Sequence, residues 1–518
     1  MWNFKVKTKV ERKHCPWWLD LIGFLLFAAG ISLLAAVLWE IETLNVGIAE
    51  IIFTLTSPLD GADSGIARGA LRQCLPGVLI LCALYGSYLI YLRKFNRLHF
   101  TIRITARKHS CAIRSRNLFR WIAVLIPVLT WLVTCYTIER NLFFSSYIKA
   151  QLDKTTIYED YYVRPSDVEI SAKGKTKNII CLYLESMEVT YSSRETGGFQ
   201  DVNLMPNLTE LAYDNISFGT TPGGKLGGME TITDTGWTSA ALMATTSGVP
   251  FSFPMSDPSE VGVSTSFAPN LETLGNVLQE KGYTQEFLCG SNASFGGRRT
   301  YFTGHGNYDI YDYETAISTG RLPSDYYVWW GFEDSVLYDI AKEELLRLSE
   351  TGEPFNLTML TVDTHFPDGY LCSLCEKGKY SVPLASIVEC ADRQAANFIQ
   401  WCKEQDFYED TVIVVMGDHP RMDTLLVSGA DMADRKVYEC FINADVAPDA
   451  PDPSTRLFSH MDLFPTILSA MGFQIEGDRL GLGVNLFSQQ PTLVEQLGRE
   501  ALNAELQKTS KFYEANFY

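Results

Sequence analysis

The chain has 518 residues, several times the length of one small domain, which excludes a small module held together by disulfides. Hydrophobic residues make up 46% of the chain and charged residues only 20%, a composition that excludes extensive disorder and favours membrane-embedded segments. Residues 1–140 carry 17 basic and 8 acidic side chains, whereas residues 141–518 carry 26 basic and 53 acidic ones. This uneven distribution of the net charge of -18 predicts two parts that lie in different compartments.

Three uncharged stretches come close to the ~20 residues that a membrane-spanning helix needs. They comprise residues 21–39, 76–92 and 121–138. We predict a transmembrane helix in each. The first is longer than the apolar core of a signal peptide, and Trp39-Glu40 follows it in place of the small residues of a cleavage site, so we expect no cleavage. Residues 1–138 are therefore predicted to form a membrane domain, and residues 139–177 a polar linker.

The charges beside these spans predict how the chain crosses the membrane, because Lys and Arg accumulate in cytoplasmic loops. Residues 5–13 are rich in Lys and Arg, and residues 93–120 hold nine of them and no acid. The loop between the first two spans holds five acids and two basic residues. We expect both basic segments in the cytoplasm and everything after residue 138 outside it. Because the basic loop lies between two spans, we interpret it as an orientation signal and expect no nucleic-acid binding.

From Asn178 onward, short apolar runs rich in β-branched residues alternate with helix-like stretches. This pattern is typical of an α/β domain in which helices flank a parallel sheet. Three runs are predicted to be strands, at residues 179–184, 355–362 and 411–416. The domain is expected to extend over residues 178–518.

Polar side chains follow each of these runs. The first run is followed by Glu185-Ser186, the second by Asp363-Thr364-His365 and the third by Gly417-Asp418-His419. Ligands of open parallel sheets sit beyond the carboxyl ends of the strands, so these residues are expected to converge on one site. Any one of them alone would be explained as the end of a strand, but carboxylates and imidazoles from three strands have the composition of a metal site.

Residues 235–248 (TGWTSAALMATTSG) contain a Gly-bearing turn, a small-residue stretch with helical character and a terminal Gly248. Thr238 therefore falls at or near a helix N-terminus, where free N–H groups and the helix dipole favour an anion such as a phosphoryl group. A Thr hydroxyl becomes a competent nucleophile when a divalent metal activates it. The alternative is that Thr238 is an ordinary N-cap. The modifiable Cys or Ser motif of sulfatases is missing from this segment.

Seven of the twelve cysteines follow residue 138, so at least one is unpaired within the chain. Cys372, Cys375 and Cys390 lie close together in the sequence and predict a disulfide that staples a loop in an oxidising compartment. A zinc knuckle is the alternative, although no nearby His or second CxxC motif supports it.

Five segments together resemble the phosphoglycerol transferase and lipoteichoic acid synthase group of the alkaline phosphatase and sulfatase superfamily. They occur in the expected order within residues 178–490 and comprise Leu184-Glu185-Ser186, Gly236-Trp237-Thr238, Thr364–Pro367, Met416–His419 and Ser459–Thr466. Within the group, Thr235–Thr238, His365–Tyr370 and Gly477–Gly483 look most like the phosphoglycerol transferase I branch. The resemblance implies transfer of phosphoglycerol from phosphatidylglycerol to periplasmic glucans, with release of diacylglycerol.

The resemblance also implies a sulfatase-like fold with a mixed, mostly parallel sheet flanked by helices. It implies a multi-pass protein of the bacterial inner membrane whose catalytic domain lies in the periplasm or outside. One Mn²⁺ or Mg²⁺ ion is the implied cofactor, and its implied ligands are Glu185, Thr238, Asp418 and His419.

The resemblance implies roles in catalysis and substrate binding as well. Thr238 would also be the nucleophile, forming a phosphothreonine-type intermediate. His365 would be a substrate contact or proton donor. Arg298 falls where the group places a basic contact to phosphoglycerol, with Arg299 as an adjacent alternative.

Other functions remain as alternatives. A lipoteichoic acid synthase-like polymerase is disfavoured, because Cys289-Gly290-Ser291 and Gly296 stand where those enzymes hold glycerol, and because three spans are predicted in place of five. A phosphoethanolamine transferase would use more histidines around its metal. A non-catalytic envelope protein that binds glycans would not need the intact set of motif residues.

Two features are expected to be structural. His460 and Asp462 precede the apolar stretch 463–471, and we predict that they cap and buttress a helix. Residues 493–508 are predicted to form one amphipathic helix that packs on the domain.

Overall fold

The computed structural model describes residues 3–9, 16–44, 46–56, 64–94, 99–106, 109–172, 174–252, 266–431 and 434–518. The chain divides into two compact units, Met1–Val46 with Ser64–Ser146 and Gly47–Asp63 with Tyr147–Tyr518. Several charged residues that bear on the predicted membrane orientation lie outside the described residues: Arg12, Lys13, Asp60, Asp63, Arg97, Arg107 and Lys108.

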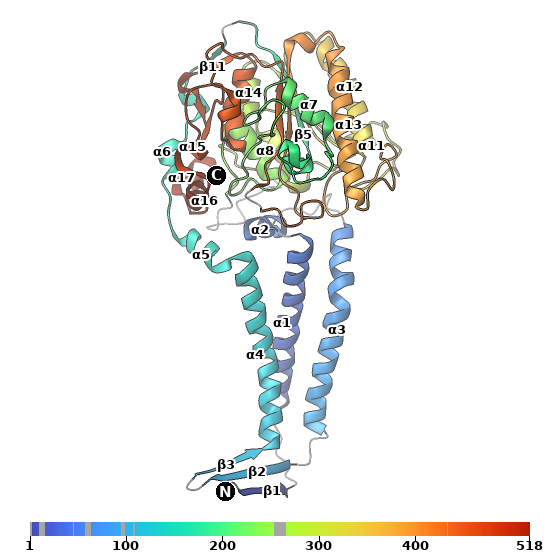
Figure 1. The fold of residues 1–518 in the computed structure, drawn as a ribbon, viewed down its shortest axis with the longest axis vertical. Helices are drawn as coiled ribbons and strands as arrows, with labels where there is room; N and C mark the ends of the chain where they lie inside the picture. Colours follow the sequence, from blue (N-terminus) through green and yellow to red (C-terminus); the bar gives the residue numbers. More distant parts are fainter. Residues whose placement is uncertain are drawn as a thin grey trace. The chain divides into compact units, whose positions relative to one another are not determined.

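The first unit contains three long helices, α1 (Trp17–Thr43), α3 (Ser64–Lys94) and α4 (Ser115–Leu142) (Figure 1). Each includes one of the predicted uncharged stretches and is long and apolar enough to cross a membrane. Helix α1 contacts α4 closely at Gly30, where an added Cβ would lie 3.1 Å from Trp131 Nε1. The Thr134 hydroxyl donates a hydrogen bond to the Gly30 carbonyl (3.2 Å). Small residues of this kind let membrane helices pack tightly.

The basic segments beside these helices form structure that the sequence did not indicate. Strands β1 (Asn3–Lys9), β2 (His99–Ala106) and β3 (His109–Arg114) make a three-stranded antiparallel sheet. The segments predicted only as orientation signals thus pair with each other.

The second unit is built on a six-stranded sheet with the strand order β10-β9-β5-β8-β6-β7. All neighbouring strands are parallel except β10, which runs antiparallel to β9. The strands are β5 (Asn178–Leu184), β6 (Thr284–Cys289), β7 (Asp309–Tyr311), β8 (Phe355–Leu360), β9 (Thr411–Gly417) and β10 (Glu439–Ile442). The predicted mixed, mostly parallel sheet is confirmed, and the three predicted runs are its neighbouring strands β9, β5 and β8.

Helices cover both faces of this sheet because its strands are apolar on both sides. Alternate residues of β5 face opposite layers, so Cys181 and Tyr183 join one core while Ile180 and Leu182 join the other. One layer contains α7 (Pro206–Asp214), α11 (Tyr313–Ser318), α12 (Asp334–Glu350) and α13 (Pro383–Lys403). The other contains α8 (Thr238–Ser247), α9 (Leu274–Glu280), α10 (Arg298–Gly304) and α14 (Leu463–Ala470). Figure 1 shows α12 and α13 on one side of β5 and α14 on the other.

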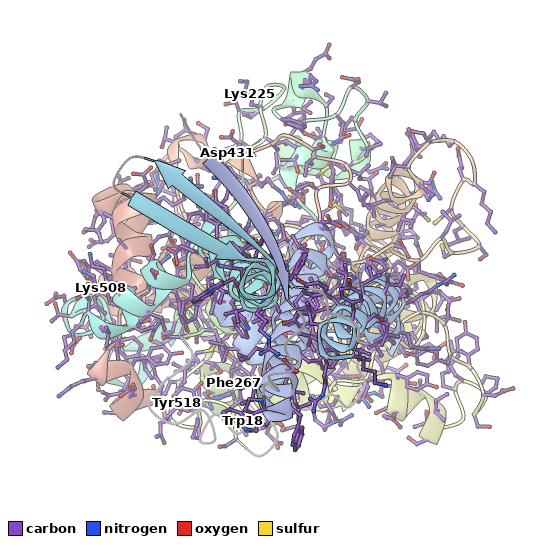
Figure 2. The ribbon with its side chains drawn as sticks, turned by 90° about the horizontal axis from the view of Figure 1, so that it is seen from below. Trp18, Lys225, Phe267, Asp431, Lys508 and Tyr518 are labelled. Carbon is purple, nitrogen blue, oxygen red and sulfur yellow. The ribbon has the colours of Figure 1, made fainter. Side chains whose placement is uncertain are left out.

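Segments distant from the sheet in sequence complete the second unit. They include α2 (Ile48–Thr56), α5 (Phe144–Leu152), α6 (Ile157–Tyr161) and the small antiparallel pairs β4 (Ile170–Ala172) with β11 (Phe473–Ile475) and β12 (Arg479–Leu480) with β13 (Gly483–Val484). Within the stretch predicted as a linker, Tyr158 is buried against Tyr513 and Phe517. Charged side chains such as Lys225 and Asp431 lie at the outer edge of this unit (Figure 2).

The C-terminal segment differs from its prediction. Residues 493–508 form two helices, α15 (Leu493–Leu497) and α16 (Arg499–Leu506), and α17 (Lys511–Phe517) follows. The break falls at Gly498, whose φ of 78° lies in the left-handed region that glycine tolerates. The prediction of a single helix over residues 493–508 was therefore wrong.

A buried ion pair joins the loops that follow β5 and β9. Arg435 Nη2 lies 2.5 Å from Glu188 Oε1, and neither side chain is exposed to solvent. Arg435 Nη2 also donates to the Arg421 carbonyl (2.6 Å), and the Arg421 N–H donates to Glu188 Oε1 (3.3 Å). Breaking such a pair leaves an uncompensated buried charge, which costs far more than losing an exposed pair.

We expect Arg435→Met to lower the free energy of unfolding by about 3–5 kcal/mol, because Glu188 would remain buried without its counter-ion. Urea unfolding of the purified chain measures this change. Lys175→Met is the matched control, since Lys175 pairs with Asp410 at an exposed position, and it should cost at most about 1 kcal/mol. Equal losses in the two variants would contradict the prediction.

Candidate active site

The carboxyl ends of β5 and β9 bring two acids together. The parallel register pairs Leu184 with Gly417, so the next residues, Glu185 and Asp418, lie side by side. Glu185, Asp418 and His419 are at most 2% exposed. Their side-chain ligand atoms all lie within 4.8 Å of one another. The structure therefore gathers the residues that the sequence placed at the ends of two separate strands.

Thr238 meets this group from the N-terminus of α8. It is the first residue of the helix, and the N-cap residue is Trp237, so Thr238 is not the N-cap that we considered as an alternative. Its Oγ1 lies 3.4 Å from Glu185 Oε2 and 3.3 Å from His419 Nε2. The helix ends, as predicted, at Gly248, whose φ is 67°.

The hydrogen bonds around this group leave ligand atoms free for a cation. Asp418 Oδ1 accepts from the N–H groups of Ser186 (2.7 Å) and His419 (2.8 Å), whereas Asp418 Oδ2 is buried and accepts no hydrogen bond from the described residues. His419 Nδ1 donates to the Pro420 carbonyl (2.9 Å), which directs Nε2 at the acids. His419 Nε2 lies 3.6 Å from Glu185 Oε1 and 3.4 Å from Asp418 Oδ2.

This donor set fits a divalent metal. Two carboxylates, an imidazole and a hydroxyl suit Mn²⁺, Mg²⁺ or zinc. Ligand atoms held about 2.1 Å from one ion at tetrahedral angles lie about 3.4 Å apart, which is close to the separations measured here. An unpaired buried carboxylate oxygen at Asp418 is otherwise costly.

The ionisation of these groups reflects their burial and mutual repulsion. Burial, together with the neighbouring Glu185 carboxylate, raises the pKa of Asp418 to about 6. Burial alone would lower the pKa of His419, but the carboxylates of Asp418 and Glu185 outweigh it, and the net shift is upward. A bound cation would favour the ionised form of both carboxylates.

His365 lies close enough to interact electrostatically with His419 and Asp418. Burial lowers its pKa to about 4, so the imidazole is neutral near pH 7. Its Nδ1 donates to the Phe366 carbonyl (2.5 Å), which leaves Nε2 as a proton acceptor. The ring packs against Trp330, with centroids 4.7 Å apart. In this state Nε2 can accept a proton, and the role that the resemblance implied, a substrate contact or proton donor, stays a prediction.

Arg298 is buried beside the start of α8 without a counter-ion. It is 6% exposed, and no carboxylate of the described residues pairs with it. Its guanidinium donates to the carbonyls of Phe295 (3.0 Å) and Asn292 (2.9 Å), and the nearby Gly296 carbonyl accepts from Ser239 (2.8 Å). Arg299, the alternative, is engaged with the buried Asp312 at 2.6 Å. The uncompensated cation at Arg298 suits an anionic ligand.

The structure adds neighbours that sequence reasoning missed. Trp330 lies between His365 and Phe295, and its indole N–H is buried without a partner in the described chain. Phe53 of α2 packs against Trp237 (centroids 5.9 Å) and Phe251 (5.2 Å). Neither Trp330 nor Phe53 belongs to a motif. The only sequence signal for Phe53 was an apolar patch between two predicted spans.

His460 and Asp462 are structural, as predicted. His460 Nε2 donates to the Asp418 carbonyl (2.7 Å) and so supports a site residue from behind. Asp462 accepts from the N–H groups of Ser459 and Val484, at 2.9 Å each, within a capping box that precedes α14.

The chain is similar to known sulfatases and phosphoglycerol transferases. The sulfatase family model matches residues 177–473. Phosphoglycerol transferase I of Xanthomonas campestris pv. campestris is 30% identical over 325 residues, which cover 62% of this chain and 43% of that protein. Phosphoglycerol transferase I of Escherichia coli O6:K15:H31 is 29% identical over 492 residues, which cover 92% of this chain and 57% of that protein. The chain thus spans about half the length of these curated relatives.

The chain also matches parts of two solved structures. Lipoteichoic acid synthase LtaP of Listeria monocytogenes is 18% identical, with a TM-score of 0.49, and the match covers 64% of this chain and 81% of that chain. A protein of the alkaline phosphatase superfamily from Vibrio parahaemolyticus is 24% identical, with a TM-score of 0.46, over 62% of this chain and 71% of that chain.

We expect Asp418→Asn to weaken Mn²⁺ binding by about 100-fold or more, because an amide replaces the carboxylate whose Oδ2 is unpaired. Titration of the purified, metal-stripped chain with Mn²⁺ measures the affinity. Asp339→Asn, which changes an exposed carboxylate on α12, is the control and should bind as the wild type does. Unchanged Mn²⁺ affinity in Asp418→Asn would show that this cluster is not the metal site.

Proposed function

The chain belongs to the sulfatase family, and from this premise we propose that it is a membrane-bound, metal-dependent phosphoglycerol transferase. Its donor would be phosphatidylglycerol and its acceptor a glycan outside the cytoplasm, in the manner of periplasmic glucans. The observation that carries the proposal is the position of Thr238 Oγ1, at the N-terminus of α8 and 3.3–3.4 Å from His419 and Glu185. The Thr238 hydroxyl, which is the proposed nucleophile, thus lies at a helix end that favours an anion. It also lies beside the acidic cluster that favours a cation.

The reaction would proceed by two displacements. Thr238 Oγ1 attacks the lipid phosphorus, the bond from phosphorus to the diacylglycerol oxygen breaks, and the threonine proton ends on diacylglycerol. A glycan hydroxyl then attacks the phosphoglyceryl-threonine, its proton ends on Thr238, and phosphoglycerol leaves on the glycan. A bound Mn²⁺ or Mg²⁺ would lower the pKa of the Thr238 hydroxyl and offset charge on the phosphoryl oxygens.

The chain's own residues supply the remaining steps. The free N–H groups of the first turn of α8 face the non-bridging oxygens, where developing charge needs stabilisation. The Arg298 guanidinium would bind the same anion or the phosphate of the donor, because it is buried without a carboxylate partner. Neutral His365 would take the proton of the attacking glycan hydroxyl through Nε2.

The membrane topology supports a lipid donor. Helix α2 lies between the first two predicted spans yet belongs to the same compact unit as the sulfatase domain. That loop and the domain would therefore lie on the same side of the membrane, and the charge distribution favours the outer side. A site tethered there meets its lipid substrate at high effective concentration.

We expect Thr238→Ala to abolish release of diacylglycerol from phosphatidylglycerol, because the variant lacks the hydroxyl that would attack the lipid phosphorus. Labelled phosphatidylglycerol in detergent micelles, with and without glucan, gives the release rate and the product. Thr303→Ala removes an exposed hydroxyl on α10 and is the matched control. Full release of diacylglycerol by Thr238→Ala would show that Thr238 is not the nucleophile. Transfer from phosphatidylethanolamine alone would show that phosphatidylglycerol is not the donor.

Arg298→Lys should lower kcat/KM for phosphatidylglycerol by about 10- to 100-fold, since lysine cannot reproduce the fork of guanidinium donors and a hydrogen bond to a charged group contributes about 1.5–3 kcal/mol. Arg321→Lys, at an exposed pair with Glu343, is the control. Steady-state kinetics over a range of donor concentrations separates KM from kcat. An unchanged kcat/KM would remove Arg298 from substrate binding.

A further inference from the structure

Three buried cysteines gather in a part of the second unit that the proposed function does not use. Cys372 and Cys375 lie in the loop between β8 and α13, and Cys390 lies on α13. Their exposed fractions are 1%, 8% and 1%. With Ile387 they form a small apolar cluster, separate from the two cores that cover the sheet.

The three sulfur atoms form a triangle and not a pair. Cys372 Sγ lies 3.5 Å from Cys375 Sγ and 3.8 Å from Cys390 Sγ, and the three are free thiols. All three sulfurs lie within 4.8 Å of one another. Thiolates about 2.3 Å from a tetrahedral zinc ion lie about 3.8 Å apart, so these separations match the edges of a zinc–sulfur tetrahedron. The predicted disulfide would use two of the sulfurs and leave the third without a role.

Hydrogen-bond donors surround these sulfurs. The backbone N–H groups of Leu374 and Cys375, the second and third residues after Cys372, point at Cys372 Sγ. Backbone N–H groups surround a metal-bound thiolate of a zinc knuckle in the same way. Arg393 Nη2 lies 3.4 Å from Cys390 Sγ and also donates to the Leu374 carbonyl (2.7 Å). Gln394 Nε2 lies 3.5 Å from the same sulfur. The arginine charge offsets the net negative charge that three thiolates and one Zn²⁺ carry.

We propose that Cys372, Cys375 and Cys390 bind one zinc ion as thiolates. Binding releases three thiol protons to solvent and forms three zinc–sulfur bonds, with no change in oxidation state. No other Cys, His, Asp or Glu side chain in the described ranges joins the cluster, so water completes the tetrahedron. This site is distinct from the cluster at Glu185 and Asp418.

The zinc ion would fasten the loop that carries His365. Between β8, which ends at Leu360, and α13, which begins at Pro383, the chain has no helix or strand. Near His365 this stretch is held by hydrogen bonds such as that from the Tyr370 N–H to the Asp363 carbonyl (2.7 Å) and those from the Arg421 guanidinium to the carbonyls of Thr364 and Pro367. A metal bridge from this loop to α13 supplies order that regular structure does not. The site would therefore be structural, acting on His365 through the loop.

Zinc content of the full chain tests the proposal. The experiment uses the Asp418→Asn variant as its background, because this change weakens the other cluster. The chain is purified in detergent without reductant and dialysed against metal-free buffer, and its metal content is measured by mass spectrometry. We expect about one zinc ion per chain, and its loss in Cys390→Ala. Cys402→Ala is the matched control, because Cys402 is a buried cysteine on the same helix, and it should retain the zinc.

Cobalt substitution and thiol counting cover the case in which a cysteine variant folds poorly. Co²⁺ added to the zinc-stripped chain should give thiolate-to-cobalt charge-transfer absorption, and Zn²⁺ should displace it. Alkylation after unfolding in a chelator should label Cys372, Cys375 and Cys390 without prior reduction. A disulfide between any two of them, or one zinc ion retained in Cys390→Ala, would overturn the proposal whatever the outcome at Thr238.

Discussion

Two carboxylates buried side by side are the constraint on which the rest of this structure depends. The register of β5 and β9 forces Glu185 and Asp418 together, and burial excludes the water that would screen them. One imidazole, His419, does not neutralise both acids, and Asp418 Oδ2 lacks a hydrogen-bond donor within the described residues. A divalent cation bound between the two acids would resolve this imbalance, and the Thr238 hydroxyl lies beside that position.

The surroundings hold this costly arrangement in place. The Glu188–Arg435 pair is fully buried, and Arg435 bonds to the carbonyl of Arg421. The guanidinium of Arg421 in turn donates to the carbonyls of Thr364 and Pro367, on either side of His365. The loops after β5, β8 and β9 are thus linked through buried charges, and rigid links of this kind keep reacting groups within the narrow distances that catalysis needs.

The sequence predicted the parts of this site that depend on local pattern. Apolar runs located β5, β8 and β9, and the segment from Thr238 to Gly248 located α8, because strand and helix signals lie within a few residues. Contacts between distant segments carry no such signal. The sequence therefore did not predict that Phe53 packs against Trp237 or that Trp330 packs against His365. The spacing of the cysteines left a disulfide and a zinc site open, because spacing alone does not show how three sulfurs meet.

The central claim is that Thr238 carries the phosphoryl group between donor and acceptor. Incubating the chain with Mn²⁺ and phosphatidylglycerol, without a glycan acceptor, and then sequencing its peptides by mass spectrometry tests this directly. A phosphoglycerol adduct on Thr238, formed only with metal and lost when glucan is added, is the predicted result. Turnover of the donor with no adduct on Thr238, or an adduct on another residue, would contradict the claim.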